Sequence, residues 1–372
     1  MFNLRGLWRR HRRKVFVAVG VFGGSYALYK LYQAHSARVL YLEDERRVDE
    51  LIKTQLQQHF ESIQRISDTT TLPYAMHYLR SRMLEELDLS AITDRLMQGK
   101  EQPSSLTAKE KLELWEQLKN LSFTKTVSSL WAMTMLCLYV RVQVNILGRH
   151  LYVETARGLG SSQLLDKEDS LNSHGQQEFL GTADFLSTYG VTSLISSMQN
   201  AVVDVMKEKQ LKDLFSVAQL RETITRILES FMGSDDSNHW LNYLLPEDAT
   251  TYRQLMAVSS NGSGNSSFFM DISKLEKLMG ETRAVLSSPD FQNIAMLSLR
   301  KMVDMLMEDI ASSFNSTSSS EVPLARLLPR VAQIGSPMLQ DPTNNKFIHA
   351  IQSTPEVELF YTLLYSNLPP GF

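Results

Sequence analysis

The chain has 372 residues, of which 43% are hydrophobic, and its formal net charge is −3. The first 42 residues hold eight Lys or Arg and no acid, so the remaining body has 30 bases against 41 acids. The acidic body excludes a nucleic-acid binder that acts by charge, and one cysteine, Cys137, excludes an internal disulfide framework.

The chain starts with a basic segment that leads into an uncharged one. Residues 15–29, VFVAVGVFGGSYALY, carry no charge. As a helix they span about 23 Å, and about 27 Å if Lys30 extends to the interface and the helix continues to Tyr32. The sequence therefore predicts a basic targeting segment at 1–14 and a transmembrane anchor at 15–32. The bases nearest the anchor are Arg9, Arg10, Arg12, Arg13 and Lys14.

Two other interpretations of this segment stay open. A cleaved signal peptide would use the small residues Ala34 and Ser36, but Lys30 and several tyrosines precede them. A mitochondrial presequence should be amphipathic and Ser-rich rather than continuously apolar. We favour a permanent N-terminal anchor.

The body, residues 33–372, has helical periodicity almost throughout. The run from Glu43 to Ile66 has apolar residues at helical spacing and contains neither Gly nor Pro. Because strand signals are scarce, the sequence predicts an all-α fold. Further helices are predicted at about 73–98, 108–122, 127–148, 176–208, 217–232, 273–312, 324–335 and 355–367.

Three tracts rich in Gly, Ser and Asn interrupt the helices, at 233–238, 259–267 and 312–323. They cannot pack well, so we expect surface excursions and not domain boundaries. A second uncharged run at 127–140 is shorter than a typical span and is followed at once by Arg141. It predicts a buried core helix, in which Cys137 is an inert small side chain.

Motifs that carry chemistry are missing from the sequence. No two of the eight histidines have metal-ligand spacing, and no G-x-S-x-G, Walker or G-x-G-x-x-G motif occurs. We therefore expect no enzyme, no cofactor and no metal site. A pocket with converging titratable groups would favour an enzyme instead.

One stretch, residues 108–123, is typical of a docking surface. Its core-facing stripe consists of Leu114, Leu118 and Leu121. Trp115 lies about 90° from that stripe, with Lys111 one turn before it and Lys119 one turn after it. A tryptophan between two lysines suits an acidic, amphipathic partner helix. The alternative is a tryptophan covered by a neighbouring helix of the same chain.

The same stretch resembles the peroxin-3 family of peroxisomal membrane docking factors. The similar segments are LELWEQLKNLSFTKT at 112–126, LYVRVQVNILGRHLYVE at 138–154, HWLNYLLP at 239–246, ETRAVLSSPDF at 281–291 and PLARLLPRV at 323–331. Each is weak alone, but their order and spacing cover essentially the whole chain. The resemblance implies an elongated all-helical bundle that a short N-terminal transmembrane helix holds on the peroxisome.

The resemblance also implies a function. The body would dock the N-terminal amphipathic helix of peroxin-19, the chaperone that carries newly made peroxisomal membrane proteins, and so support their insertion and peroxisome assembly. The docking residues would be Trp115, Lys111, Leu118 and Lys119. Thr93 and Leu96 would form the opposite wall, although the family's loop differs in length around 97–107. The family's basic targeting cluster corresponds to Arg9, Arg10, Arg12, Arg13 and Lys14.

The resemblance implies an N-terminus in the lumen, a body in the cytosol, and the endoplasmic reticulum as a second location during biogenesis. The positive-inside rule would instead keep the basic N-terminus in the cytosol. We follow the resemblance, because that rule summarises cotranslational insertion. A helical scaffold on the mitochondrial outer membrane or the endoplasmic reticulum is the alternative function.

Overall fold

The computed structural model describes residues 54, 58, 60–101, 106–160, 173–233, 238–259, 271–314, 321–340 and 342–366. The predicted targeting segment at 1–14 and the anchor at 15–32 lie outside these residues. So do most of the helix predicted at 43–66 and most of the three Gly, Ser and Asn tracts.

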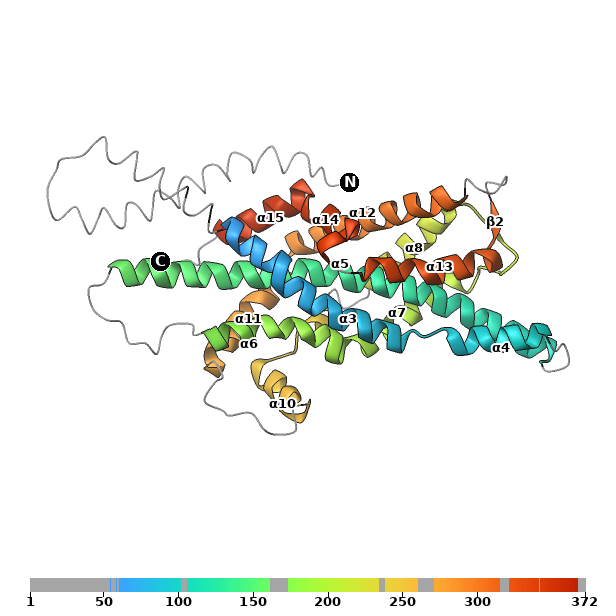
Figure 1. The fold of residues 1–372 in the computed structure, drawn as a ribbon, viewed down its shortest axis with the longest axis horizontal. Coiled ribbons are helices and arrows are strands. Elements are labelled where there is room, and N and C mark those ends of the chain that lie inside the picture. Colours follow the sequence, from blue (N-terminus) through green and yellow to red (C-terminus); the bar gives the residue numbers. More distant parts are fainter. Residues whose placement is uncertain are drawn as a thin grey trace.

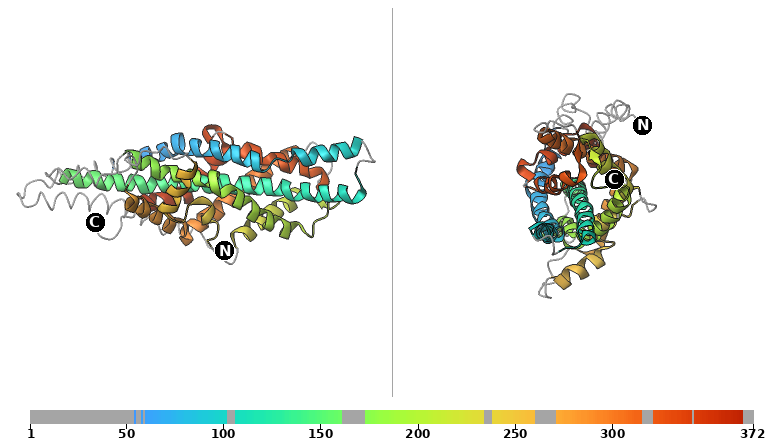
Figure 2. Two further views of the ribbon diagram at one scale, coloured as in Figure 1. Left: turned by 90° about the horizontal axis from the view of Figure 1, so that it is seen from below. Right: turned by 90° about the vertical axis from the view of Figure 1, so that its right-hand side faces the viewer.

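One long helix organises the fold. Helix α5 (Ala108–Gly160) has 53 residues, which corresponds to about 80 Å, and it runs along most of the molecule in Figures 1 and 2. It is long and apolar enough to cross a membrane, but its apolar window is entirely buried inside the bundle. Every residue of the uncharged run at 127–140 is buried, so the predicted core helix is confirmed.

Other helices surround α5 and bury its apolar residues. Those that pack against it are α3 (Leu72–Glu86), α4 (Ser90–Glu101), α6 (Ser173–Gly181), α7 (Val191–Met206), α8 (Val217–Met232), α9 (Leu241–Leu244), α11 (Ile272–Leu286), α12 (Pro289–Phe314), α13 (Leu324–Met338), α14 (Lys346–Gln352) and α15 (Pro355–Ser366). Helix α10 (Ala249–Ser259) packs on α11. The predicted all-α, elongated bundle is confirmed (Figure 2).

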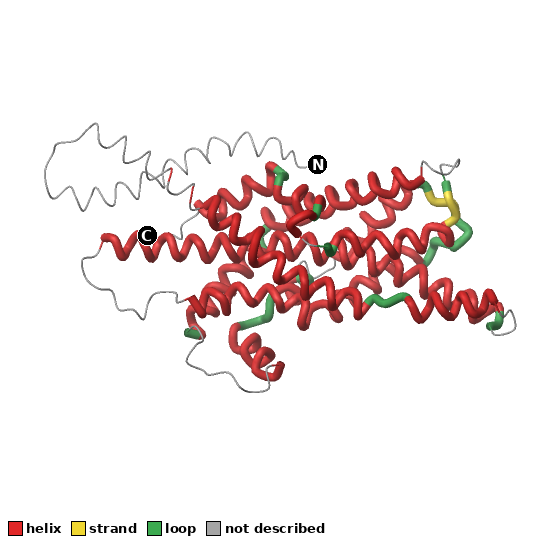
Figure 3. The backbone as a smooth tube through the Cα atoms, in the orientation of Figure 1, coloured by secondary structure: helices red, strands yellow, loops and turns green. Residues whose placement is uncertain are grey.

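Short irregular elements complete the described fold. A two-residue antiparallel ladder joins β1 (Leu214–Phe215) to β2 (Val322–Pro323), shown in yellow in Figure 3. The remaining elements are the π-helices η1 (Ser67–Thr71) and η3 (Leu186–Gly190) and the 3₁₀-helices η2 (Thr182–Asp184) and η5 (Pro342–Asn344).

Several helix boundaries differ from the predicted ones. The helices expected at 108–122 and 127–148 are one, since neither Gly nor Pro lies between them and the hydroxyls of Ser122 and Thr124 are accommodated by donating to the carbonyls of Leu118 and Asn120. The helix expected at 273–312 is two, because Pro289 begins a new helix. The helix expected at 73–98 is also two, since the chain leaves helical geometry at Leu87.

The first described residues lie beside the C-terminal half of α5. The side-chain amide of Gln64 donates to Asn145 Oδ1 at 3.1 Å and accepts from Arg141 Nε at 2.9 Å. Gly148 faces Ile63 so closely that a Cβ atom would overlap the Ile63 side chain. A glycine is therefore required where this segment crosses α5.

A buried ion pair joins α5 to α11. The guanidinium of Arg149, which is 6% exposed, pairs with the Glu281 carboxylate. The same carboxylate lies 2.7 Å from His150 Nε2, and Arg149 Nη1 donates to the Leu364 carbonyl of α15 at 3.4 Å. Burial lowers the pKa of Arg149, because desolvation disfavours the charged form. Three helices are thus connected through one charged group.

Candidate functional site

The candidate site lies on a helical hairpin at one end of the bundle. Helix α4 packs against the first turns of α5, and Gly99 of α4 lies beside Lys111 of α5 (Figure 1). Helix α5 starts with a capping box, in which Thr107 N donates to Glu110 Oε2 at 2.7 Å and Glu110 N donates to Thr107 Oγ1 at 3.2 Å. The Thr107 amide and the Thr107 hydroxyl, at 2.8 Å, both donate to the Glu110 carboxylate, and these two bonds lower the pKa of Glu110.

The leucine stripe beside Trp115 determines which part of the indole is buried. Leu114 and Leu118 are each 6% exposed and face the interior, as predicted, and Leu121 is half-buried. Trp115 is also half-buried and packs against the core. Part of the indole therefore stays accessible to a partner while the rest is held by this chain's own side chains.

Both helices of the hairpin expose further apolar side chains. Met97 on α4 is 62% exposed and Leu112 on α5 is 58% exposed, high values for large apolar side chains. Lys111, one turn before Trp115, is half-buried. We call the surface formed by Met97, Lys111, Leu112 and Trp115 the hairpin surface. It combines exposed apolar groups with one cation.

Lys119 does not offer a free cation at this surface. The residue is 2% exposed, and its ammonium donates to the carbonyls of Met206 at 3.3 Å and Lys209 at 2.8 Å. It also pairs with Glu116 at 2.6 Å. Because a lysine beside the last carbonyls of a helix stabilises that end, Lys119 attaches the C-terminal end of α7 to α5. The expected pair of flanking cations is thus reduced to Lys111.

The two residues expected to form an opposite wall lie on α4. Thr93 is half-buried, and its hydroxyl donates to the Leu89 carbonyl one turn earlier. Leu96 is half-buried and packs against the core. Since α4 packs on α5, both residues belong to the hairpin that carries Trp115. Their contact with a partner stays a prediction.

Two exposed side chains of the hairpin surface were missed from the sequence. Leu112 is three positions before Trp115, so it had the spacing to extend the tryptophan's face of the helix. Met97 had no comparable signal, because apolar residues of α4 also form its packed face. The carbonyl partners of Lys119 could not be found, since they lie about ninety positions further along the chain.

A charged trough of about 480 Å³ lies between α8 and α12. Its arginines are each paired with a carboxylate: Arg221 with Asp304, Arg226 with Glu222 and Arg300 with Glu229. These ion pairs are exposed and leave no cation of the trough unpaired. Among the described residues, no group of three His, Cys, Asp or Glu could hold a metal ion. Burial raises the pKa of Cys137 to about 12, so its thiol is unreactive.

Comparison with known proteins connects this fold to one family. The family model described as Peroxin-3 matches residues 98–367, which include most of the hairpin surface. Peroxisome biogenesis protein 3-1 of Arabidopsis thaliana is 48% identical over 98% of this chain and 99% of its own length. Peroxisomal biogenesis factor 3 of Homo sapiens is 28% identical over 97% of both chains. The chain therefore belongs to the Peroxin-3 family of peroxisome biogenesis factors.

Proposed function

We propose that this chain is a membrane-anchored docking receptor for peroxin-19. In this proposal the N-terminal amphipathic helix of peroxin-19 binds the hairpin surface, and the receptor acts by binding and not by catalysis. Newly made peroxisomal membrane proteins then reach the bilayer through peroxin-19, and residues 15–32 hold the receptor on the peroxisomal membrane. Family membership supports the role in peroxisome biogenesis.

The observation that carries the proposal is the accessible indole of Trp115 beside Lys111. Large, partly buried aromatic side chains are the usual hot spots of protein interfaces. The exposed side chains of Met97 and Leu112 enlarge the apolar area, and the ammonium of Lys111 favours an acidic partner. An amphipathic helix with an acidic edge matches these features.

Titration calorimetry of the full-length chain in detergent micelles tests the proposal. A synthetic peptide of the peroxin-19 N-terminal helix should bind with one site, and its affinity should fall as salt screens Lys111. A scrambled peptide of the same composition is the control. Equal heats from the two peptides, or no heat from either, would exclude docking through this helix.

The orientation in the membrane is a second part of the proposal. We place the body in the cytosol and the short basic N-terminus in the lumen, because peroxin-19 is soluble and must reach the hairpin surface from outside the organelle. Protease added to intact peroxisomes should therefore digest the body. A body that is cut only after the membrane is permeabilised would contradict this orientation.

A further inference from the structure

A second surface of the protein carries a carboxylate near aromatic side chains, whereas the hairpin surface carries the ammonium of Lys111. It lies along the line where α3 meets the segment formed by η2, η3 and α7. Tyr74 near the start of α3 is close enough to Asp184 of η2 to feel its charge, and Glu86 at the end of α3 accepts a hydrogen bond from Thr192 of α7 at 3.2 Å. The two segments thus run parallel, and we call this line the α3–α7 seam.

Exposed aromatic rings lie at the first end of the seam. Tyr74 is 57% exposed and Tyr78 is 45% exposed, and their ring centroids are 5.0 Å apart in an edge-to-face arrangement. Phe185 and Tyr189, both half-buried, form a second ring pair with centroids 5.6 Å apart on the segment facing α3. These adjacent rings present aromatic area at the surface of the protein.

A carboxylate that no described cation pairs with, Asp184, lies near Tyr74. Asp184 is half-buried, and no described residue donates a hydrogen bond to its carboxylate or forms an ion pair with it. Desolvation raises its pKa to about 6, with no described cation close enough to oppose that shift. The pKa of Tyr74 is raised mainly by its hydrogen bond to Tyr78, and the pKa values of Tyr139 and Tyr252 are raised mainly by burial. The Asp184 charge adds a smaller increase to all three, so its carboxylate lies near these hydroxyls.

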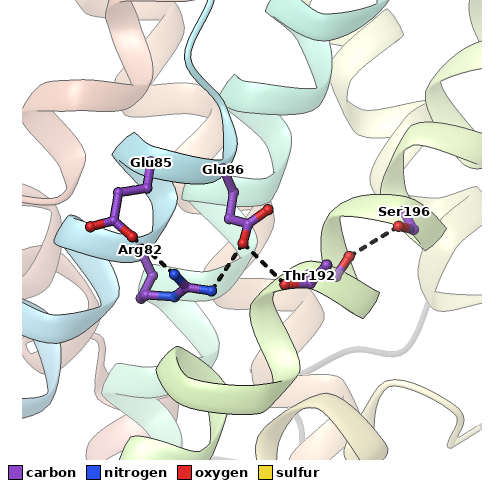
Figure 4. A network of polar contacts seen from close by, with 5 residues as sticks. All are labelled: Arg82, Glu85, Glu86, Thr192 and Ser196. Atoms are coloured by element: carbon purple, nitrogen blue, oxygen red, sulfur yellow. Dashed lines mark hydrogen bonds and ion pairs between the residues drawn. The ribbon is translucent and has the colours of Figure 1, made fainter.

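At the other end of the seam, the charged side chains pair with one another within this chain, in contrast to Asp184. Figure 4 shows Arg82 between Glu85 and Glu86, with both contacts at 2.9 Å, and Thr192 linking Glu86 to α7. Ser196 in turn donates to the Thr192 carbonyl at 3.0 Å. This network joins the two helices at the surface and uses its own cation. At the aromatic end, the described residues supply no cation to Asp184.

We propose that the aromatic end of the α3–α7 seam binds a lysine or arginine side chain of a partner protein. The cation would lie against the faces of Tyr74 and Tyr78 and pair with the Asp184 carboxylate. Aromatic faces attract ammonium and guanidinium groups, and a carboxylate among them adds direct charge complementarity. A half-buried carboxylate that destabilises the free protein is typical of a site that is completed by its ligand. This site is independent of peroxin-19 docking at the hairpin surface.

Binding of a model cationic peptide tests the proposal. The probe is a fluorescein-labelled amphipathic helix made of leucine and lysine, and its twin has glutamate in place of lysine. With the full-length chain in non-ionic detergent, fluorescence anisotropy should show the lysine peptide binding about tenfold more tightly. The His77 ring lies 5.7 Å from the Tyr78 ring, so the pH dependence is measured in a His77→Gln background. There the affinity should fall between pH 7 and pH 5, because Asp184 must be ionised to pair with the lysine.

Variants distinguish binding of the lysine peptide at this site from its general electrostatic attraction to the acidic body of the chain. Asp184→Asn should weaken binding of the lysine peptide about tenfold, whereas Asp204→Asn, at an exposed carboxylate of α7, should leave it unchanged. Tyr74→Leu should weaken binding about threefold and Tyr74→Phe should preserve it, since a cation needs the ring and not the hydroxyl. Circular dichroism of each variant monitors the fold.

Three outcomes would overturn the proposal. The first is unchanged affinity in Asp184→Asn, and the second is equal loss in Asp184→Asn and Asp204→Asn. The third is complete displacement of the lysine peptide by millimolar phosphocholine, which would assign the site to a lipid headgroup instead. None of these outcomes depends on peroxin-19, so they leave the proposed docking at Trp115 to its own test.

Discussion

Replacing Glu281 by alanine should lower the free energy of unfolding by about 3 to 5 kcal/mol. The substitution leaves the Arg149 guanidinium buried between α5, α11 and α15 without its carboxylate. An uncompensated buried charge costs more than the attraction that it had gained, because water no longer solvates it. Urea unfolding of the full-length chain in detergent, followed by circular dichroism, measures the change.

Two further variants test whether the loss of stability comes from the unpaired buried charge of Arg149 or merely from the removal of a carboxylate. Glu229→Ala removes a carboxylate whose pairing with Arg300 is exposed, so it should cost at most about 1 kcal/mol. The double variant Arg149→Met with Glu281→Met replaces the buried pair by apolar groups and should recover most of the stability. Equal losses for Glu281→Ala and Glu229→Ala would show that burial of Arg149 has no such cost.

Trp115→Ala should weaken peroxin-19 docking by about 2 kcal/mol or more, close to thirtyfold in affinity. The substitution removes the accessible indole and leaves the leucine stripe, Leu114 and Leu118, in place. Since the other part of the indole packs against the core, a smaller loss of stability should accompany it. Calorimetric titration with the peroxin-19 peptide gives the affinity, and circular dichroism shows whether the fold is retained.

The two lysines beside Trp115 provide a matched comparison. Lys111→Ala should reduce affinity for the peptide and hardly change stability, because this side chain is partly accessible. Lys119→Ala should instead reduce stability by about 1 to 3 kcal/mol, because the Met206 and Lys209 carbonyls lose their buried donor. If Trp115→Ala binds the peroxin-19 peptide with native affinity, Trp115 is not part of the docking site.

Local patterns predicted the helices well where a helix has its own start and stop signals. Helix α8 was predicted with its observed bounds, because Ser216 and Gln219 form a capping box at its start and Gly233 follows its end. The split between α3 and α4 has a weaker signal, since neither Gly nor Pro occurs near Leu87 and only Asp88, which accepts from the Ser90 amide at 2.9 Å, marks the start of α4. Helix packing against the rest of the bundle decides that boundary.

The candidate site was predictable only in part. The spacing of Leu114 and Leu118 was enough to place Trp115 at the edge of the buried face, which the structure confirms. It could not distinguish Lys111 from Lys119, because the burial of Lys119 depends on the end of α7 arriving from a distant part of the sequence. No sequence pattern marks Asp184 as a binding residue, since the tyrosines near it belong to three other helices.

The length of α5 sets how far peroxin-19 would be held from the point where the N-terminal segment joins the body. Trp115 and Asn145, which contacts Gln64, are thirty positions apart on one helix, or about 45 Å. That distance is comparable to the full thickness of a bilayer. A flexible tether needs about 70 residues to cover it on average. In the proposed function, the docked helix of peroxin-19 would therefore lie about one bilayer thickness along α5 from Gln64, and any chain that reaches from one to the other would have to span that gap.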